Sequence, residues 1–250
     1  MDGSYLFQPE VIAASRNFVC ARLISYEDKD EAEFLKAVSR TASGELENSS
    51  FGMVAPDGKT KLLFAGRVIR STYADSKAMA EGMNKIMEKF TPKAEISALP
   101  LTATVRIGLD VAASDTQPFV LILAADQDKR AALEAELARL AWTPAFVGRF
   151  IYASTADAKS LAAIEGLKDG SSVFVIQPDK FGLKGKVLAQ TGSIKDIPNT
   201  LTSGAKDFVR EEKDLRTQIT AGRRLKIFWD TKIPVTDPGE AAARDRTKLQ

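Results

Sequence analysis

The sequence carries one short pattern twice, and this repetition constrains the fold more than any other feature. Residues 49–57 and residues 171–179 both read Ser-Ser, then five residues suited to a strand, then Pro-Asp. A second apolar run follows each Pro-Asp step, so each copy predicts a β-hairpin around a turn. Gly66 and Gly192 close the two hairpins at similar distances. The pattern favours an internal duplication; the alternative is that two hairpins of a common kind arose independently.

The residues around the first hairpin predict the order helix, strand, helix, hairpin, helix. The predicted elements are a helix over residues 9–16, a buried strand over 18–24, an amphipathic helix over 27–39, a hairpin over 51–65 and a helix over 75–90. The strand is predicted from its β-branched and aromatic residues, and the helices from apolar residues at helical spacing. Pro56-Asp57-Gly58 marks the hairpin turn.

The second half predicts a similar order after a stretch that contains Pro92, Pro100 and Pro118. The predicted elements are a strand over residues 119–124, a helix over 128–140, a strand over 145–153, a helix over 156–165, a hairpin from 173–177 and 186–190, and a helix over 197–216. Between the halves, only residues 103–109 look like a strand. We therefore predict a first module over residues 1–92, a connecting segment over 93–118, a second module over 119–216, and a C-terminal arm with a flexible tail over 217–250.

This order of strand, helix, strand, helix, hairpin and closing helix resembles the thioredoxin fold. Residues 9–19 resemble the segment just downstream of the C-x-x-C motif in thioredoxin-like proteins, where a helix ends and a Phe-Val strand begins. Asp57-Gly58-Lys59 resembles the turn between the last two strands of those proteins. The resemblance implies an α/β fold with two thioredoxin-like modules in tandem, each a mixed sheet flanked by helices, plus the C-terminal arm. It also implies that the first module lacks its N-terminal strand and motif region in this chain.

The chain departs from this family where the redox chemistry would lie. In the second module, Asp126, Gln127, Asp128 and Lys129 occupy the place of the cysteine pair. Two serine pairs replace the family's proline before the hairpin: Ser49 with Ser50, and Ser171 with Ser172. The resemblance places these serines at an edge that binds extended peptides in thioredoxins, although ordinary strand entry explains them equally well. We predict no catalytic residue.

The residue inventory excludes several classes of chemistry. The chain has no histidine and one cysteine, so it cannot build a Ser-His-Asp triad, an intrachain disulfide or a four-thiolate zinc site. The formal net charge of +2 gives no case for nucleic-acid binding, and no apolar run reaches the roughly 20 residues of a membrane span. We predict no metal and no cofactor.

Three local features allow two interpretations each. Cys20 is predicted as a small buried hydrophobe in a strand, and alternatively as a free reactive thiol. Asp126 or Asp128 is predicted to cap the following helix; alternatively the two carboxylates bind a cation through oxygen atoms. The stripe Met79, Met83 and Met87 is predicted as a core ridge, and alternatively as a copper-binding array.

The last apolar cluster, residues 223–229, mixes basic and aromatic side chains. We predict that it docks on the second module or on another subunit; contact with nucleic acid or an anionic membrane is the alternative. The first residues lack the basic and apolar regions of a signal peptide. The compartment therefore stays open, and a periplasmic or secreted location would require that a leader had been removed.

Two functions follow from these observations. The first is a redox-inert thioredoxin-like protein that binds or scaffolds a protein partner, or that self-associates. The second is a thiol-disulfide oxidoreductase whose C-x-x-C lies upstream of the first residue.

Overall fold

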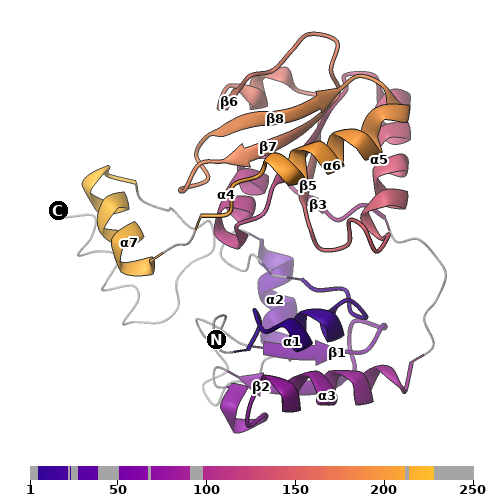
Figure 1. The fold of residues 1–250 in the computed structure, drawn as a ribbon, viewed down its shortest axis with the longest axis vertical. Coiled ribbons are helices and arrows are strands. Elements are labelled where there is room, and N and C mark those ends of the chain that lie inside the picture. Colours follow the sequence, from indigo (N-terminus) through magenta and orange to yellow (C-terminus); the bar gives the residue numbers. More distant parts are fainter. Residues whose placement is uncertain are drawn as a thin grey trace. The chain divides into compact units, whose positions relative to one another are not determined.

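The computed structural model describes residues 5–21, 23, 28–38, 51–66, 69–90, 98–211 and 214–227. The chain divides into two compact units, of which the first contains the described residues up to 90 and the second those from 98 to 227 (Figure 1). The whole is a mixed α/β structure, with a helix-flanked sheet in the second unit. In the described part of the chain, no helix is long and apolar enough to cross a membrane.

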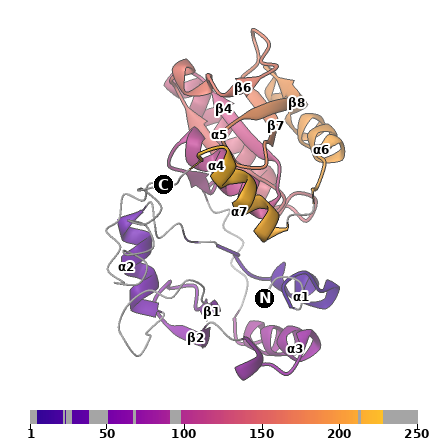
Figure 2. The same cartoon turned by 90° about the vertical axis from the view of Figure 1, so that its left-hand side faces the viewer.

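The first unit pairs a hairpin with helices. Its elements are α1 (Pro9–Ser15), α2 (Lys29–Val38), β1 (Phe51–Val54), β2 (Lys61–Gly66), the short 3₁₀ helix η2 (Ile69–Ser71) and α3 (Ser76–Met87). Helices α1 and α3 lie side by side (Figure 2). Asp75 caps α3 by accepting a hydrogen bond from the backbone N–H of Ala78 at 2.8 Å. Met79 and Met83 are buried in the core of this unit, which confirms the core ridge for these two residues, whereas Met87 is half-buried and lies outside the buried cluster.

The strand predicted over residues 18–24 is wrong for residues 18–21, where the structure has no strand. Val19 is 71% exposed, and Cys20 is an exposed free thiol rather than a buried one. A run of β-branched and aromatic residues forms a strand only where a neighbouring strand satisfies its backbone. In the described residues the sheet of this unit has two strands, β1 and β2.

The two predicted hairpins are confirmed, and their turns are alike. In the first, Asp57 Oδ1 accepts hydrogen bonds from the N–H groups of Lys59 and Thr60, both at 2.8 Å. These bonds and one from the Thr60 hydroxyl lower the pKa of Asp57 to about 2. In the second, Asp179 Oδ1 accepts from the N–H groups of Phe181 and Leu183 at 3.2 and 2.8 Å. In both turns a glycine, Gly58 or Gly182, follows with a positive φ, a backbone conformation that residues with a side chain rarely adopt.

The second unit is built on a six-stranded sheet with the order β3-β5-β4-β7-β8-β6. The strands are β3 (Leu101–Thr102), β4 (Phe119–Leu123), β5 (Ile151–Thr155), β6 (Ile164–Glu165), β7 (Val173–Pro178) and β8 (Gly185–Thr191). Strand β4 runs parallel to β5 and antiparallel to β7, and β7 and β8 form the hairpin. Four residues of β4, from Phe119 to Ile122, are fully buried because the sheet is covered on both faces.

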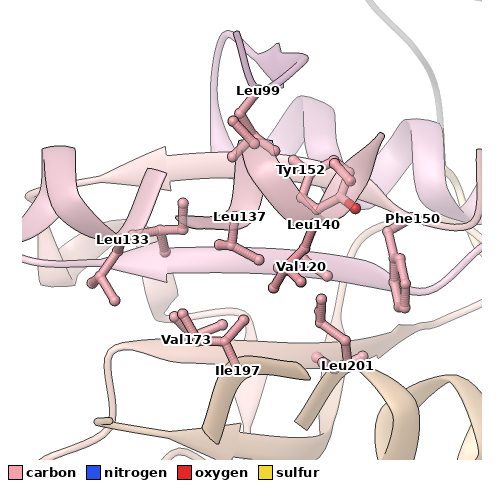
Figure 3. Close-up of a cluster of buried hydrophobic side chains, with 14 of the residues drawn as sticks. Leu99, Val120, Leu133, Leu137, Leu140, Phe150, Tyr152, Val173, Ile197 and Leu201 are labelled. Atoms are coloured by element: carbon pink, nitrogen blue, oxygen red, sulfur yellow. The ribbon is translucent and has the colours of Figure 1, made fainter. Parts of the chain in front are cut away.

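Helices cover the two faces of this sheet. One face packs on α5 (Gln127–Ala141) and α6 (Ile197–Asp207), with Leu133, Leu137 and Leu201 among the buried side chains (Figure 3). The other face packs on α4 (Val105–Asp115) and the 3₁₀ helix η3 (Ala158–Leu161). The result is a layer of helix, a layer of sheet and a second layer of helix.

Four parts of this unit differ from the prediction. The strand predicted over residues 145–153 begins only at Ile151, in β5, and turns precede it. Residues 98–118, predicted as a connecting segment, contribute β3 and α4, and the strand predicted over 103–109 is a helix that Thr104 caps. The helix predicted over residues 156–165 consists of η3 followed by β6. The helix predicted over 197–216 ends at Asp207, and a separate helix α7 (Leu215–Arg224) follows.

The break after α6 has a specific cause. The Gln177 side chain on β7 holds the backbone of Val209, accepting from its N–H at 2.9 Å and donating to its carbonyl at 3.3 Å. This pairing requires extended backbone, and Phe208 is extended with φ −68° and ψ 126°. Helix α7 then docks on the β7–β8 turn, where Gln218 donates to the carbonyl of Lys180 at 2.7 Å and Gly222 lies against Phe181.

A second glutamine covers the outer edge of β8. Gln190 accepts from the N–H of Lys168 at 2.8 Å and donates to the carbonyl of Gly166 at 2.9 Å. Beside it, β6 pairs with β8 only at Gly185 and Lys186. The amide side chain therefore continues the pairing that β6 begins, and it satisfies backbone groups at an edge that would otherwise be open.

We expect Tyr152→Phe to stabilise the second unit. Tyr152 is 3% exposed, and its hydroxyl has no hydrogen-bond partner among the described residues. A buried unsatisfied polar group costs about 1–3 kcal/mol, so removing it should raise the free energy of unfolding by about 1 kcal/mol in urea denaturation.

Tyr5→Phe is the matched comparison. The hydroxyl of Tyr5 is also on a buried residue, but it donates to the carbonyl of Tyr73 at 2.9 Å. The same change should therefore destabilise the first unit by about 1 kcal/mol. A loss of stability in Tyr152→Phe as large as that in Tyr5→Phe would show that the Tyr152 hydroxyl does have a partner.

Candidate functional site

The residues predicted to replace the cysteine pair lie at one end of the second unit's sheet. Strand β4 ends here, and its register with β7 pairs Ile122 with Val173. Leu123 N–H donates to the carbonyl of Ser172 at 2.8 Å, and Ala124 N–H donates to the carbonyl of Thr155 at 3.2 Å. The end of β4, the end of β5 and the start of β7 therefore meet. The structure brings the Asp126–Lys129 turn and the Ser171–Ser172 pair to the same end of the sheet.

Asp126 caps α5, as the sequence predicted. Its side chain accepts a hydrogen bond from the N–H of Lys129 at 2.7 Å, and α5 begins at Gln127. Gln127, Asp128 and Lys129 are all exposed, with Asp128 in the first turn of the helix. An acidic residue there interacts favourably with the free N–H groups of the helix. Among the described residues, no group of three or more Cys, Asp and Glu side chains is placed to hold a metal ion.

A polar network that sequence reasoning missed supports this turn. The guanidinium of Arg130 donates to the carbonyl of Ala124 at 2.9 Å, which holds the end of β4 against the first turn of α5. Glu134 lies 3.9 Å from Arg130 and accepts a hydrogen bond from the hydroxyl of Ser154 on β5. The i and i+4 spacing of Arg130 and Glu134 could have predicted this ion pair from the sequence, because such residues share one face of a helix. The link to Ser154 depends on strand pairing and has no local signal.

The two serines of the second pair have different roles. Ser172 is 3% exposed, and its N–H donates to the carbonyl of Thr191 at 2.8 Å while its own carbonyl accepts from Leu123. Its backbone is thus part of the sheet. Ser171 is half-buried, and no described residue donates a hydrogen bond to its carbonyl oxygen. The first pair, Ser49 and Ser50, lies outside the described residues.

Close backbone packing fixes this end of the sheet. A Cβ atom on Gly192 would lie 2.1 Å from the carbonyl oxygen of Gly170, a distance that real Cβ contacts never reach. Gly192, which the sequence marked as the end of the hairpin, therefore allows the loop before Ser171 to lie directly on the end of β8. The contact therefore fixes the position of the loop that leads into Ser171.

Cys20 lies in the first unit, and the hydrogen-bond partner of its thiol is a backbone carbonyl, not an acid or a base. Its thiol donates to the carbonyl of Ser15 at 3.7 Å, and local desolvation raises the pKa of the thiol. Desolvation is the larger effect and outweighs the opposing effect of this hydrogen bond, so the pKa of the Cys20 thiol lies above its ordinary value, which disfavours a nucleophilic thiolate.

Two surface hollows occur elsewhere. One of about 440 Å³ lies between α1 and α3, with a floor of Ala13, Ala14 and Ala80. At its rim, Glu10 accepts a hydrogen bond from Ser76, which lowers the pKa of Glu10. The other, of about 590 Å³, lies along α7.

Comparison of the chain with protein-family models, with curated protein sequences and with solved structures found no match in any of the three.

We expect Asp126→Ala to lower the free energy of unfolding of the second unit by about 1 kcal/mol, because the N-cap is lost. Asp126→Asn keeps an oxygen acceptor for the N–H of Lys129 and should change stability by only a few tenths of a kcal/mol. Asp128→Ala is the comparison: Asp128 is exposed and makes no cap, so its loss removes only the weaker interaction with the helix N-terminus, about 0.3 kcal/mol at an exposed site. Urea denaturation followed by circular dichroism measures all three. An increase in melting temperature on adding calcium, abolished in Asp126→Asn, would instead support the cation-binding interpretation.

Proposed function

We propose that residues 98–211 form a thioredoxin-like module that has no redox centre and that acts by binding a protein segment. The observation that carries this proposal is the place of the Asp126–Lys129 turn. This turn joins the buried strand β4 to the helix α5 that follows it in sequence. It lies at the end of the sheet where the hairpin strand β7 begins.

The order of elements supports the fold assignment. From β4 onward the unit runs strand, helix, strand, 3₁₀ helix, antiparallel hairpin and closing helix. This is the order in which the sequence resembles the thioredoxin fold, and α5 and α6 cover the same face of the sheet. For the first unit, support is limited to the order of a helix, a hairpin and a further helix.

The chemistry of the turn supports the absence of redox activity. Asp126 uses its carboxylate to cap α5, and Lys129 stands at the position of the second cysteine. No sulfur atom lies in the second unit at all, because the chain's one cysteine is Cys20. Thiol-disulfide exchange requires a thiolate that attacks a disulfide, so the second unit cannot perform it.

The backbone at Ser171 supports a binding role. Extended peptides bind sheet proteins by pairing with unused backbone groups and by placing side chains in neighbouring hollows. The carbonyl of Ser171 is such a group, and it stands next to β7 at the surface. A segment that pairs there would cross the Asp126 turn, where the exposed Asp128 and Lys129 would meet polar or charged side chains.

Grafting a cysteine pair tests the fold assignment. In a Cys20→Ser background, Asp126→Cys with Lys129→Cys should form a reducible disulfide and give insulin reduction above background. The control pair, Asp214→Cys with Thr217→Cys, has the same positions at the start of α7, where Asp214 caps by accepting from Thr217 N–H at 2.9 Å. Equal activity from both pairs would show that any helix start suffices. Insulin reduction by the unaltered chain would contradict the redox-inert assignment.

Peptide selection tests the binding role. Peptides selected from a displayed library on the full chain should lose at least about tenfold in affinity, near 1.4 kcal/mol, when Ser171→Arg fills the sheet end. Ser203→Arg, on the exposed side of α6, is the matched control. Thermal unfolding of both variants establishes that each is folded. Selected peptides that bind both variants as well as the unaltered chain would contradict binding at this sheet end.

A further inference from the structure

Helix α7 carries a concentrated positive charge. Arg216, Arg223, Arg224 and Lys226 lie in or directly after the helix, and residues 215–226 include no acidic residue. The whole chain has a formal net charge of only +2, so the remaining residues are net negative. All four basic residues are exposed, and none has an ion-pair partner among the described residues.

Two of these charges, those of Arg216 and Arg224, lie on the face of α7 that points away from its docking contact. Gln218 and Gly222 contact the β7–β8 turn. Arg216, Thr220 and Arg224 follow at every fourth position and therefore share the opposite face. Together with Thr217, Ala221 and Leu225, they line the hollow of about 590 Å³. Leu225 is 61% exposed, so the hollow combines guanidinium groups with apolar surface.

Helix α2 presents the complementary chemistry. Asp30, Glu33, Phe34 and Ala37 share one face by helical spacing, and all four are exposed. The opposite side of the helix carries the buried Ala32. Glu33 lies 3.8 Å from Lys36, yet its side chain remains 63% exposed and is available to a further cation. This face therefore combines two carboxylates with the exposed ring of Phe34.

We propose that α7 of one chain binds α2 of a second copy of this chain. Asp30 and Glu33 would pair with Arg216 and Arg224, while Phe34 and Ala37 would cover Leu225 and Ala221. One helix pair buries less than the roughly 1,200 Å² of a stable interface. A two-fold symmetric dimer would form the pair twice, because each chain offers both helices. The proposal does not depend on the proposed function, since α2 belongs to the first unit and α7 docks on the β7–β8 turn, at the other end of β7 from Ser171.

Other anionic partners fit these residues less well. The exposed large apolar residues of this segment, Ile219 in α7 and Leu225 directly after it, lie by helical spacing on either side of Gln218 and Gly222, so the β7–β8 turn already occupies the surface between them. A helix that lies in a membrane surface needs a continuous apolar face. Single-stranded nucleic-acid sites combine basic charge with aromatic residues that stack on bases. The described residues of the cluster 223–229 end at residue 227 and include no aromatic residue, so oligonucleotide binding is measured beside self-association.

The test is the oligomeric state of the full chain and its dependence on charge. Sedimentation velocity from about 5 µM to about 500 µM should show a monomer–dimer equilibrium that weakens from about 50 mM to about 500 mM salt. Arg216→Glu with Arg224→Glu should weaken dimerisation by at least about tenfold, because two attractive contacts become repulsive. Asp30→Lys with Glu33→Lys should do the same.

Combining all four reversals is the decisive measurement, because the swapped charges should restore dimerisation. Lys159→Glu with Lys195→Glu makes the same change in net charge at exposed lysines outside α7 and should leave the dimer intact. Circular dichroism shows whether each variant is folded. If a charge-reversal variant is unfolded, Arg216→Gln with Arg224→Gln, which removes the two charges without reversing them, takes its place and should also weaken dimerisation. A monomer at every concentration, a dimer that ignores both reversals, or reversals that the swap does not rescue would each overturn the proposal. Vesicle or oligonucleotide binding that replaces self-association would overturn it as well.

Discussion

The pairing of β4 on both sides is the interaction on which the second unit depends. Its backbone hydrogen-bonds to β5 on one side and to β7 on the other, and its side chains contribute to both hydrophobic clusters. Because side chains alternate along a strand, Val120 and Ile122 face α5 and α6, while Phe119 and Leu121 face α4. A shift of one residue would exchange these sets and place the Asp126 turn out of line with Ser172.

This one strand also defines the candidate site. The hydrogen bonds of Leu123 and Ala124 to Ser172 and Thr155 bring three segments that are distant in sequence to one end of the sheet. Arg130 then holds the carbonyl of Ala124, so the first turn of α5 is tied to the strand that precedes it. The strand-to-helix turn is thus fixed by backbone and capping hydrogen bonds, although its residues include no thiol.

The sequence predicted those elements whose cause is local. The run Phe119–Leu123, the capped helix after Asp126 and both Pro-Asp hairpins depend on residues a few positions apart, and all are present. Contacts between distant residues account for the differences. Helix α4 is buried against the sheet although Val105 and Ile107 suggested a strand. Phe208 leaves the helix because Gln177 holds Val209. At the site, the Asp126 cap was predictable, whereas the Glu134–Ser154 link and the burial of Ser172 required knowledge of the strand register.

The Gln177 contact has a mechanical consequence. Its amide makes two hydrogen bonds to a single residue, Val209, and it stands on β7 inside the central sheet. A pull on the chain beyond α7 would first act on the docking of α7 and then on these two bonds. Only after both had failed would tension reach α6 and the strands. The two hydrogen bonds between Gln177 and Val209 would therefore break before the hydrophobic core is disturbed, and they could form again while the core and the sheet end remain intact.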